Sequence, residues 1–417
     1  MSGIASSQLG LFHLHRPEII ADPTMFYARL VTEEPVLFDP VAHTWLVSRH
    51  ADVQLILAHP AATVRMDHTG ALSRFPRAGL QAAFEALDLH VSFVDGAQHQ
   101  RLRRTVSEPL QVRHVRTGLA HLIEQAVTGA FDDLTGLELI DVVPAIAARV
   151  PIDITRQLLG IADDVDTATI RRWSLAWGDV VAAPGHVPTR DRDTVLRSVA
   201  ELIDHLQQLV SMRERQPGDA MIDALIAAMH DGALSRDELI ANVMMLVTAG
   251  NETTTNLISA AVMALADDAD LWSLVNGTPG RIGDVVEELG RLYAPTQYTA
   301  RRVLEPVALS TGDVLPAGAS VALMLAAANR DPTAFPAPDE LRLDRAGVRP
   351  VTFGNGPHHC VGASLARQEV VLVLEQLTAR YAQLNPLSGR HWRRNANLRG
   401  LASLPITLTT AQTGPRR

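Results

Sequence analysis

Residues 236–267 constrain the fold more than any other stretch of the chain. The stretch opens with Ser235 and, three residues later, Glu238, the pattern of a capping box in which each side chain bonds the other residue's backbone N–H. No proline follows until Pro279, so a helix over 236–267 would be on the order of 45–50 Å long at 1.5 Å per residue. Residues 240–247 are apolar nearly all round, which predicts a helix that runs through the protein centre.

The middle of this stretch, residues 249–255 with the sequence AGNETTT, breaks the apolar pattern. Glycine costs roughly 1 kcal/mol in a helix interior, and consecutive threonines are poor helix formers. A carboxylate and hydroxyls inside a buried helix add a desolvation cost. Such a local conflict is typical of a functional site. The alternative is a threonine-rich kink whose hydroxyls bond back to helix carbonyls.

Short strands are expected on either side of a long helical region. Residues 115–230 have a helical pattern that we expect to be interrupted at Pro144, at Pro151 and over 183–188. Alternating β-prone runs predict strands at 35–38, 44–48, within 303–321 and within 398–409.

The only cysteine of the 417 residues, Cys360, lies in the run FGNGPHHCVG, residues 353–362. Gly354, Gly356 and Pro357 favour a loop, and residues 363–374 predict a buried helix directly after it. A thiol between a glycine loop and a helix N-terminus has backbone N–H groups and a positive dipole nearby, and both favour the metal-binding thiolate. The alternative is a buried core cysteine, a common fate of this residue.

The spacing Phe-x-x-Gly-x-x-x-Cys-x-Gly resembles the haem-binding loop of the cytochrome P450 family. Ala-Gly-x-Glu-Thr at 249–253 is similar to that family's oxygen-activation motif, and two further pairs match its His-x-x-x-Arg and Glu-x-x-Arg helices. The motifs occur in the family's order and the resemblance covers almost the whole chain. It implies a mainly α fold with small β-sheets (α+β), in one domain over 1–417, with haem between the long central helix and the cysteine loop.

The resemblance also implies roles for individual residues. Cys360 would ligate the iron of haem b, Glu252 and Thr253 would deliver protons during oxygen activation next to Gly250, and Glu288 with Arg291 would be a structural pair. The residues implied to contact haem are His99, Arg103, Ala249, Arg301, Phe353, Gly354, His358, Cys360 and Gly362, with His99, Arg103, Arg301 and His358 as partners of the propionates.

The substrate pocket follows from the same resemblance. Its walls would come from residues 64–94, with 183–188 as an access flap, and from Met245, Thr248, Ala249, Gln297, Tyr298 and Leu401. These residues are mostly apolar with a few polar groups, which is typical of a site for a medium-sized organic ligand. Aromatic residues make up only 4% of the chain, so an aromatic cage is not indicated.

Composition excludes several other classes of protein. A net charge of −9 argues against a nucleic-acid binder. One cysteine rules out an internal disulfide framework. No signal peptide and no run of about 18 apolar residues is found, so we expect a cytoplasmic protein that is not bound to a membrane. A monomer is also expected.

The resulting hypothesis is a bacterial monooxygenase that uses NAD(P)H through a separate ferredoxin and ferredoxin reductase. It would hydroxylate or epoxidise a small-to-medium molecule, possibly tethered to a carrier protein, in secondary metabolism. Arg101 and Arg104 would dock the acidic ferredoxin. Two alternatives stay open: a P450 that forms C–C or C–N bonds or rings without inserting oxygen, and a non-catalytic haem sensor.

Overall fold

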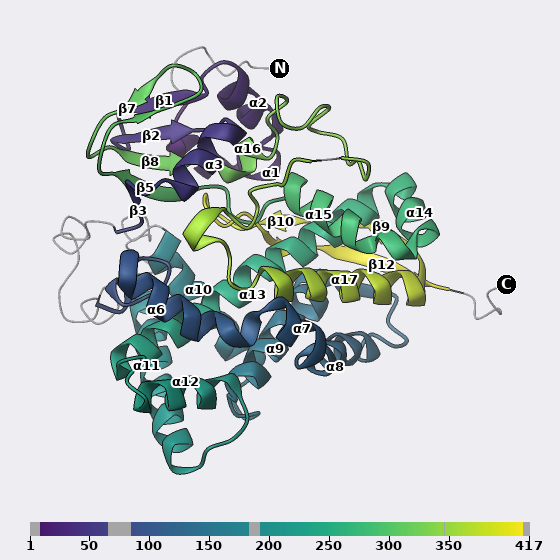
Figure 1. The fold of residues 1–417 in the computed structure, drawn as a ribbon. Helices are drawn as coiled ribbons and strands as arrows, with labels where there is room; N and C mark the ends of the chain where they lie inside the picture. The colour runs from purple at the N-terminus through teal and green to yellow at the C-terminus, as the bar shows by residue number, and fades with distance from the viewer. Residues whose placement is uncertain (1–8, 66–84, 183–191, 346, 412–417) are drawn as a thin grey trace. The chain divides into compact units, whose positions relative to one another are not determined.

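The computed structural model describes residues 9–65, 85–182, 192–345 and 347–411 (Figure 1). The chain divides into two compact units. Unit 1 comprises residues 1–64, 287–360 and 392–400, and unit 2 comprises 65–286, 361–391 and 401–417. The access flap predicted at 183–188 and much of the predicted wall at 64–94 lie outside the described residues. A single domain over 1–417 stays a prediction.

Unit 1 is built on a five-stranded sheet in the order β1-β2-β8-β5-β3. β2 pairs antiparallel with β1 and parallel with β8, and β5 pairs antiparallel with β8 and β3. The strands predicted at 35–38 and 44–48 are therefore confirmed. The strands of unit 1 are β1 (Val36–Asp39), β2 (Thr44–Val47), β3 (Ala62–Thr63), β5 (Thr299–Val303), β6 (Val307–Ala308), β7 (Val314–Leu315) and β8 (Ser320–Leu323).

Alternation along β2 and β8 gives the sheet of unit 1 two apolar faces. Leu46 and Ala322 pack in one cluster with residues of α2, whereas Val47 and Val321 pack in another with residues of α3. The sheet therefore has helices on both faces. The helices of unit 1 are the short η1 (Leu11–His15), α1 (Pro17–Ala21), α2 (Thr24–Thr32), α3 (His50–Ala58), α16 (Leu325–Ala328) and the 3-10 turn η5 (Gly356–His358).

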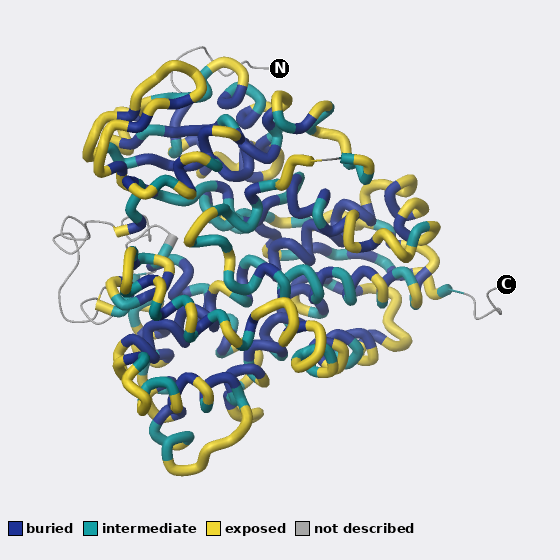
Figure 2. Tube along the Cα trace, viewed as in Figure 1, coloured by how far each residue is buried: buried dark blue, intermediate teal, exposed yellow. Residues whose placement is uncertain are grey.

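Unit 2 surrounds the long helix α13 (Arg236–Asp267). The predicted capping box is confirmed: Ser235 Oγ accepts a hydrogen bond from the Glu238 backbone N–H at 3.1 Å, and Glu238 Oε2 accepts one from the Ser235 N–H at 2.9 Å. Helices α9, α10, α11 and α17 all contact α13. Nearly every residue from Glu238 to Ala266 is buried, as predicted from the apolar pattern (Figure 2).

The remaining helices of the structure precede or follow α13 in the chain. They are α6 (Gly96–Ser107), η2 (Glu108–Leu110), α7 (Val112–Thr117), α8 (Ala120–Asp132), the π-helical turn η3 (Val143–Ala147), α9 (Arg149–Leu159), α10 (Thr167–Ala182), α11 (Arg192–Arg215), α12 (Met221–His230), α14 (Ala269–Gly277), η4 (Pro279–Arg281), α15 (Ile282–Leu292) and α17 (Ala363–Arg380).

Two expectations for residues 115–230 need correction. Pro151 does not interrupt a helix, because it lies in the first turn of α9, where a missing N–H removes no intrahelical bond. The helical region also contains a strand, β4 (Leu139–Asp141), which pairs with β12 (Pro405–Thr410) in the sheet β4-β12-β9. The other strands are β9 (Tyr381–Pro386), β10 (His391–Trp392) and β11 (Leu401–Ser403), so the strands predicted within 398–409 are confirmed.

Candidate active site

The loop before Cys360 is held by glycine geometry and by contact with α3. Gly354 and Gly356 have φ angles of 72° and 70°, which favour glycine over residues with a side chain. A Cβ on Gly356 would lie 2.8 Å from the Ala58 Cα, closer than real Cβ contacts. The loop therefore requires glycine at this position both for its backbone angle and for its close approach to α3.

Cys360 itself is exposed, which rejects the interpretation as a buried core cysteine. Its backbone N–H donates to the Phe353 carbonyl at 2.9 Å, so the ends of the loop are tied together. The 18-residue helix α17 begins at Ala363, three residues later, as predicted. The thiol is thus accessible and lies next to a helix N-terminus, where a thiolate is favoured.

Two further candidate residues lie in unit 1 with the cysteine. Arg301 on β5 is only 5% exposed, and its Nη1 donates to the Ala300 carbonyl at 2.7 Å. His358 is half-buried in the turn η5. Both are cationic or hydrogen-bonding side chains of the type that binds a carboxylate.

The predicted pair Glu288 and Arg291 is part of a larger buried network in unit 1. Arg291 is fully buried and uses all five N–H donors, two to Glu288 at 2.8 and 2.9 Å and three to backbone carbonyls. Arg345 donates a third bond to Glu288 at 2.9 Å. Sequence reasoning missed Arg345, although it lies three residues after Arg342, in the same arginine-rich run.

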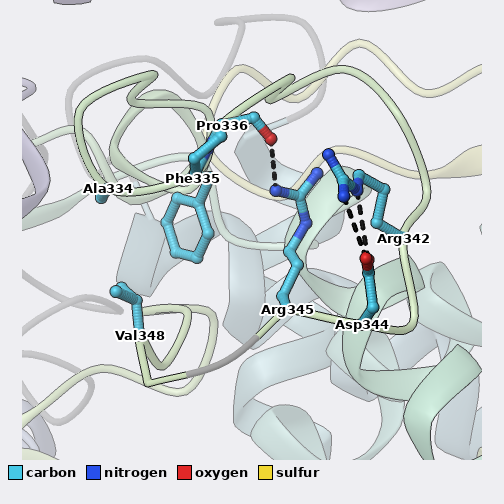
Figure 3. Close-up of a pocket in the computed structure, with 7 residues that line it drawn as sticks. All are labelled: Ala334, Phe335, Pro336, Arg342, Asp344, Arg345 and Val348. Atoms are coloured by element: carbon cyan, nitrogen blue, oxygen red, sulfur yellow. Dashed lines mark hydrogen bonds and ion pairs between the residues drawn. The ribbon is translucent and has the colours of Figure 1, made fainter.

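Figure 3 shows Arg345 pointing to the Pro336 carbonyl and Arg342 pairing with Asp344, at the wall of a cavity of about 190 Å³. A wider hollow of about 690 Å³ lies along α11 in unit 2. Neither is lined by a residue predicted for the site.

In unit 2 the burial of α13 is interrupted at one place. Ala249 is exposed and Gly250 and Thr253 are half-exposed, whereas the residues around them are buried. At about 100° per residue these three lie on one side of the helix. We refer to Ala249, Gly250 and Thr253 as the α13 window.

The α13 window does not break the helix, contrary to the idea of a kink. α13 is continuous from Arg236 to Asp267, and Thr253 Oγ1 donates to the Ala249 carbonyl at 2.7 Å. The back-bonding considered as the alternative is therefore present, but it occurs within a regular helix and leaves Thr253 partly exposed. Glu252 is 3% exposed, so the acid of the motif is buried beside the window.

The structure places His99 and Arg103 one turn apart on α6, as predicted. His99 is 4% exposed. Burial, and then the positive charge of Arg103, lowers the pKa of His99, so the ring is neutral at pH 7. Of this pair, Arg103 carries the positive charge.

Comparison with known proteins decides the family. The family profile described as "Cytochrome P450" matches residues 174–273 and 283–405. The chain belongs to the cytochrome P450 family.

Two curated relatives extend this match over nearly the whole chain. Cytochrome P450 107B1 of Saccharopolyspora erythraea is 33% identical over 91% of this chain and 93% of the relative. Vitamin D(3) 25-hydroxylase of Pseudonocardia autotrophica is 32% identical over 95% and 94%. Among solved structures, P450BioI in complex with hexadec-9Z-enoic acid ligated acyl carrier protein has a TM-score of 0.84 at 25% identity, covering 94% of this chain and all of the other.

This P450 is accordingly a haem monooxygenase, an oxidoreductase that activates O2 and receives electrons from a redox partner. The mainly α fold with small sheets is confirmed by the helices and strands above and by the P450 neighbours. None of the helices in the described parts of the chain is long and apolar enough to span a membrane.

The residues of the P450 fit the cofactor that the family implies. A soft sulfur ligand is exposed in unit 1, where a core cysteine would be buried. In unit 2 the exposed face of α13 carries only small side chains, so a flat group could approach the helix.

The residues predicted for the substrate pocket have different surroundings. Met245, one turn before the α13 window, is 4% exposed, Thr248, directly before the window, is 7% exposed, and Leu401 is buried in β11. Gln297 is directed into unit 1: its Nε2 donates to the Ala294 carbonyl at 2.6 Å, and its Oε1 accepts a hydrogen bond from Tyr27. Tyr298 packs on the same core cluster as α2. The amide of Gln297 is thus used internally, which argues against Gln297 as a polar contact for substrate.

Proposed function

We propose that this P450 hydroxylates or epoxidises a small-to-medium organic molecule as a tailoring step in bacterial secondary metabolism. The α13 window carries the proposal, because its partly exposed alcohol, Thr253, directly follows a buried acid, Glu252, on a helix that is otherwise buried. A haem sensor would not need this pair.

The cofactor would be held by the residues that the family motifs assign to it. Cys360 would ligate the iron, His99, Arg103, Arg301 and His358 would bind the propionates, and Phe353, Gly354, Gly362 and Ala249 would contact the ring. When bound, haem with a thiolate ligand supplies the oxidising chemistry and favours O–O cleavage.

The chain's own contribution to the reaction is proton handling. Thr253 already donates its hydroxyl hydrogen to the Ala249 carbonyl, so its oxygen is left to accept a hydrogen bond from a water molecule. Thr253 therefore orders a water, whereas Glu252 exchanges protons with solvent, because a carboxyl group is a common proton donor and acceptor in catalysis and a threonine hydroxyl is not.

Two relatives suggest the substrate class. One is named as a hydroxylase of vitamin D(3), and a structural neighbour is described with a fatty acid carried by acyl carrier protein. We infer an apolar substrate of similar size for this P450, either unbound or tethered to a carrier protein.

Electrons would come from NAD(P)H through a ferredoxin and its reductase, and the protein would act as a cytoplasmic monomer. The structure changes the expected docking residues. Arg101 binds Glu238 at 2.6 and 2.9 Å and the Ala233 carbonyl at 2.7 Å, so its charge is paired within unit 2. Arg104 is exposed and stays a candidate for contact with an acidic ferredoxin.

The function is tested with haem-loaded protein and a panel of terpenoids, polyketides, cyclic dipeptides and fatty acids, including fatty acyl groups on acyl carrier protein. A Soret shift selects the compound, which is then turned over with ferredoxin, reductase, NAD(P)H and ¹⁸O2. Label in the product supports hydroxylation or epoxidation. A product without label would replace the proposal with oxidative coupling, and no turnover of any compound that shifts the spectrum would favour a sensor.

The role of Thr253 has its own comparison. Thr253→Ala should consume NAD(P)H while product falls and peroxide accumulates. Thr254→Val serves as the matched control, because Thr254 directly follows Thr253 in the chain but is buried. Equal coupling in the two variants would reject the role of Thr253.

A further inference from the structure

Asn251 lies inside the α13 motif, between Gly250 and Glu252, and its side chain reaches a neighbouring helix. It is fully buried, and its Oδ1 accepts a hydrogen bond from Thr155 Oγ1 of α9 at 2.7 Å. A Cβ built on Gly250 would lie 3.5 Å from the same Thr155 oxygen. One hydroxyl on α9 thus adjoins two consecutive residues of the motif.

The Thr155 hydroxyl adjoins the edge of the window at Gly250 and forms its hydrogen bond behind the window, at Asn251. At about 100° per residue, the Asn251 side chain points roughly 150° away from the middle of the face formed by Ala249, Gly250 and Thr253. A bond at the back of the turn therefore limits how far the window can rotate or shift. Both helices belong to unit 2 and are in contact with each other.

An asparagine at this position also lowers the stability of the fold. Its Nδ2 is buried and has no acceptor among the described residues. Buried polar groups without a partner are rare and costly, and an apolar side chain would fill the space without that cost. The carbonyl oxygen of the amide, in contrast, has a partner, because it accepts the hydrogen bond from the Thr155 hydroxyl.

We propose that Thr155 is a positioning residue for oxygen activation: through Asn251 it fixes the α13 turn that presents Gly250 and Thr253. The proposal rests on the proposed function of that turn. Loss of one buried hydrogen bond of ordinary strength corresponds to about a fivefold change in the population of a correctly placed turn. Misplacement of Thr253 displaces its ordered water, so dioxygen would be released as peroxide more often.

The experiment compares haem-loaded Thr155→Val, which removes the hydroxyl at constant shape, with Thr155→Ser, which keeps it. Ser259→Ala is the matched control, because Ser259 is a buried hydroxyl on α13, two turns after the motif, and it bonds along its own helix, to the Asn256 carbonyl at 3.1 Å. Peroxide formed per NAD(P)H is measured with the compound that gives the largest Soret shift. Amide hydrogen exchange is measured over 249–254, with 257–267 as internal reference.

We expect about fivefold more peroxide per NAD(P)H in Thr155→Val, with faster exchange over 249–254 only and with near wild-type behaviour in Thr155→Ser. The double variant Thr155→Val/Asn251→Leu should match the single one, because both changes remove the same bond. Equal peroxide and equal exchange in Thr155→Val and Ser259→Ala would overturn the proposal.

Two measures separate this proposal from the proposed function. If Thr253→Ala does not uncouple, the role of the turn has failed, although the exchange data still report whether Thr155 braces it. If Thr253→Ala uncouples and Thr155→Val does not, only the present proposal has failed. Should Thr155→Val not retain haem, Asn251→Leu breaks the same bond from the other side and is judged by the same results.

Discussion

Glu288 in unit 1 and Glu369 in unit 2 are nearly equally buried, at 6% and 2% exposure. Their surroundings nevertheless shift the pKa of the two carboxyl groups in opposite directions. Burial alone raises the pKa of Glu288, but hydrogen bonds from Arg291, the Arg342 backbone N–H and Arg345 outweigh it and hold the pKa below its usual value. Burial raises the pKa of Glu369 well above the usual value, and no described residue donates to its Oε2.

Burial by itself therefore does not decide the charge state of a carboxyl group. Glu288 is a carboxylate because arginine donors replace the water it lost. Glu369 lies on α17, which packs against α13, and no described residue donates to its Oε2, so burial keeps the pKa of this carboxyl group well above its usual value. The predictions below remove one side of this contrast at a time.

The largest effect is expected from Glu288→Gln. The change leaves the fully buried Arg291 and its neighbour Arg345 without their counter-charge, which should lower the free energy of unfolding by about 3–5 kcal/mol. Urea denaturation at pH 7.5 measures the change. Asp344→Asn is the control, because the Arg342–Asp344 pair is exposed and should contribute little. Similar losses in the two variants would mean that Glu288 is not charged in the folded protein.

Arg345→Lys should have the second largest effect. The guanidinium donates hydrogen bonds to Glu288 and to the backbone carbonyls of Pro336, Ala337 and Glu340. The ammonium group of lysine cannot reproduce that planar set of donors. We expect a loss of about 1–3 kcal/mol in urea denaturation. Arg342→Lys, at an exposed arginine, is the matched control. A loss no greater than the control's would show that Arg345 adds only its charge.

Glu369→Met should shift stability in the opposite direction. Methionine fills a similar volume without a buried polar group, so we expect a gain of about 1–3 kcal/mol at pH 7.5. Glu375→Met on the exposed side of the same helix controls for helix propensity. Destabilisation of the protein by Glu369→Met alone would indicate that Glu369 has a partner in solution, such as a buried water.

These contrasts also mark what sequence could predict. The long helix, its capping box, the glycine loop before Cys360 and the pair Glu288 and Arg291 each leave a local pattern of a few residues, and the structure contains all of them. A local pattern carries its own physical cause, such as a side chain that reaches a backbone group three residues away.

Contacts between distant parts of the chain left no such signal. Arg345 meets Glu288 across 57 positions and Thr155 meets Asn251 across 96, and neither pair has a spacing that periodicity can detect. The resemblance to the family implies Gln297 as a pocket residue, but its amide bonds Ala294 and Tyr27 within unit 1. The pKa of Glu369 depends on whether the fold places hydrogen-bond donors beside its carboxyl group, and only the packed structure shows this.

The smallest effect, and the most discriminating, is the pH dependence of Glu369→Gln. The folded-state pKa of Glu369 lies above its usual value of 4.5, so its stabilising contribution is complete below that pH and is lost as the pH rises. Between pH 6 and 7 the free energy of unfolding of the wild type should therefore fall by at most about 1.4 kcal/mol more than that of Glu369→Gln, because a single proton is involved.

Glu288 titrates with the opposite sign, since its pKa is lowered: its contribution is present above the usual value and is lost only as the pH falls through the folded-state pKa. Urea denaturation at pH 4, 6 and 7 in Glu288→Gln and Glu369→Gln therefore separates the two carboxyl groups by direction alone. Relative to wild type, the stability of the Glu369 variant rises toward high pH, and the stability of the Glu288 variant rises toward low pH. Parallel profiles would mean that both groups share one charge state, and the contrast between the units would fail.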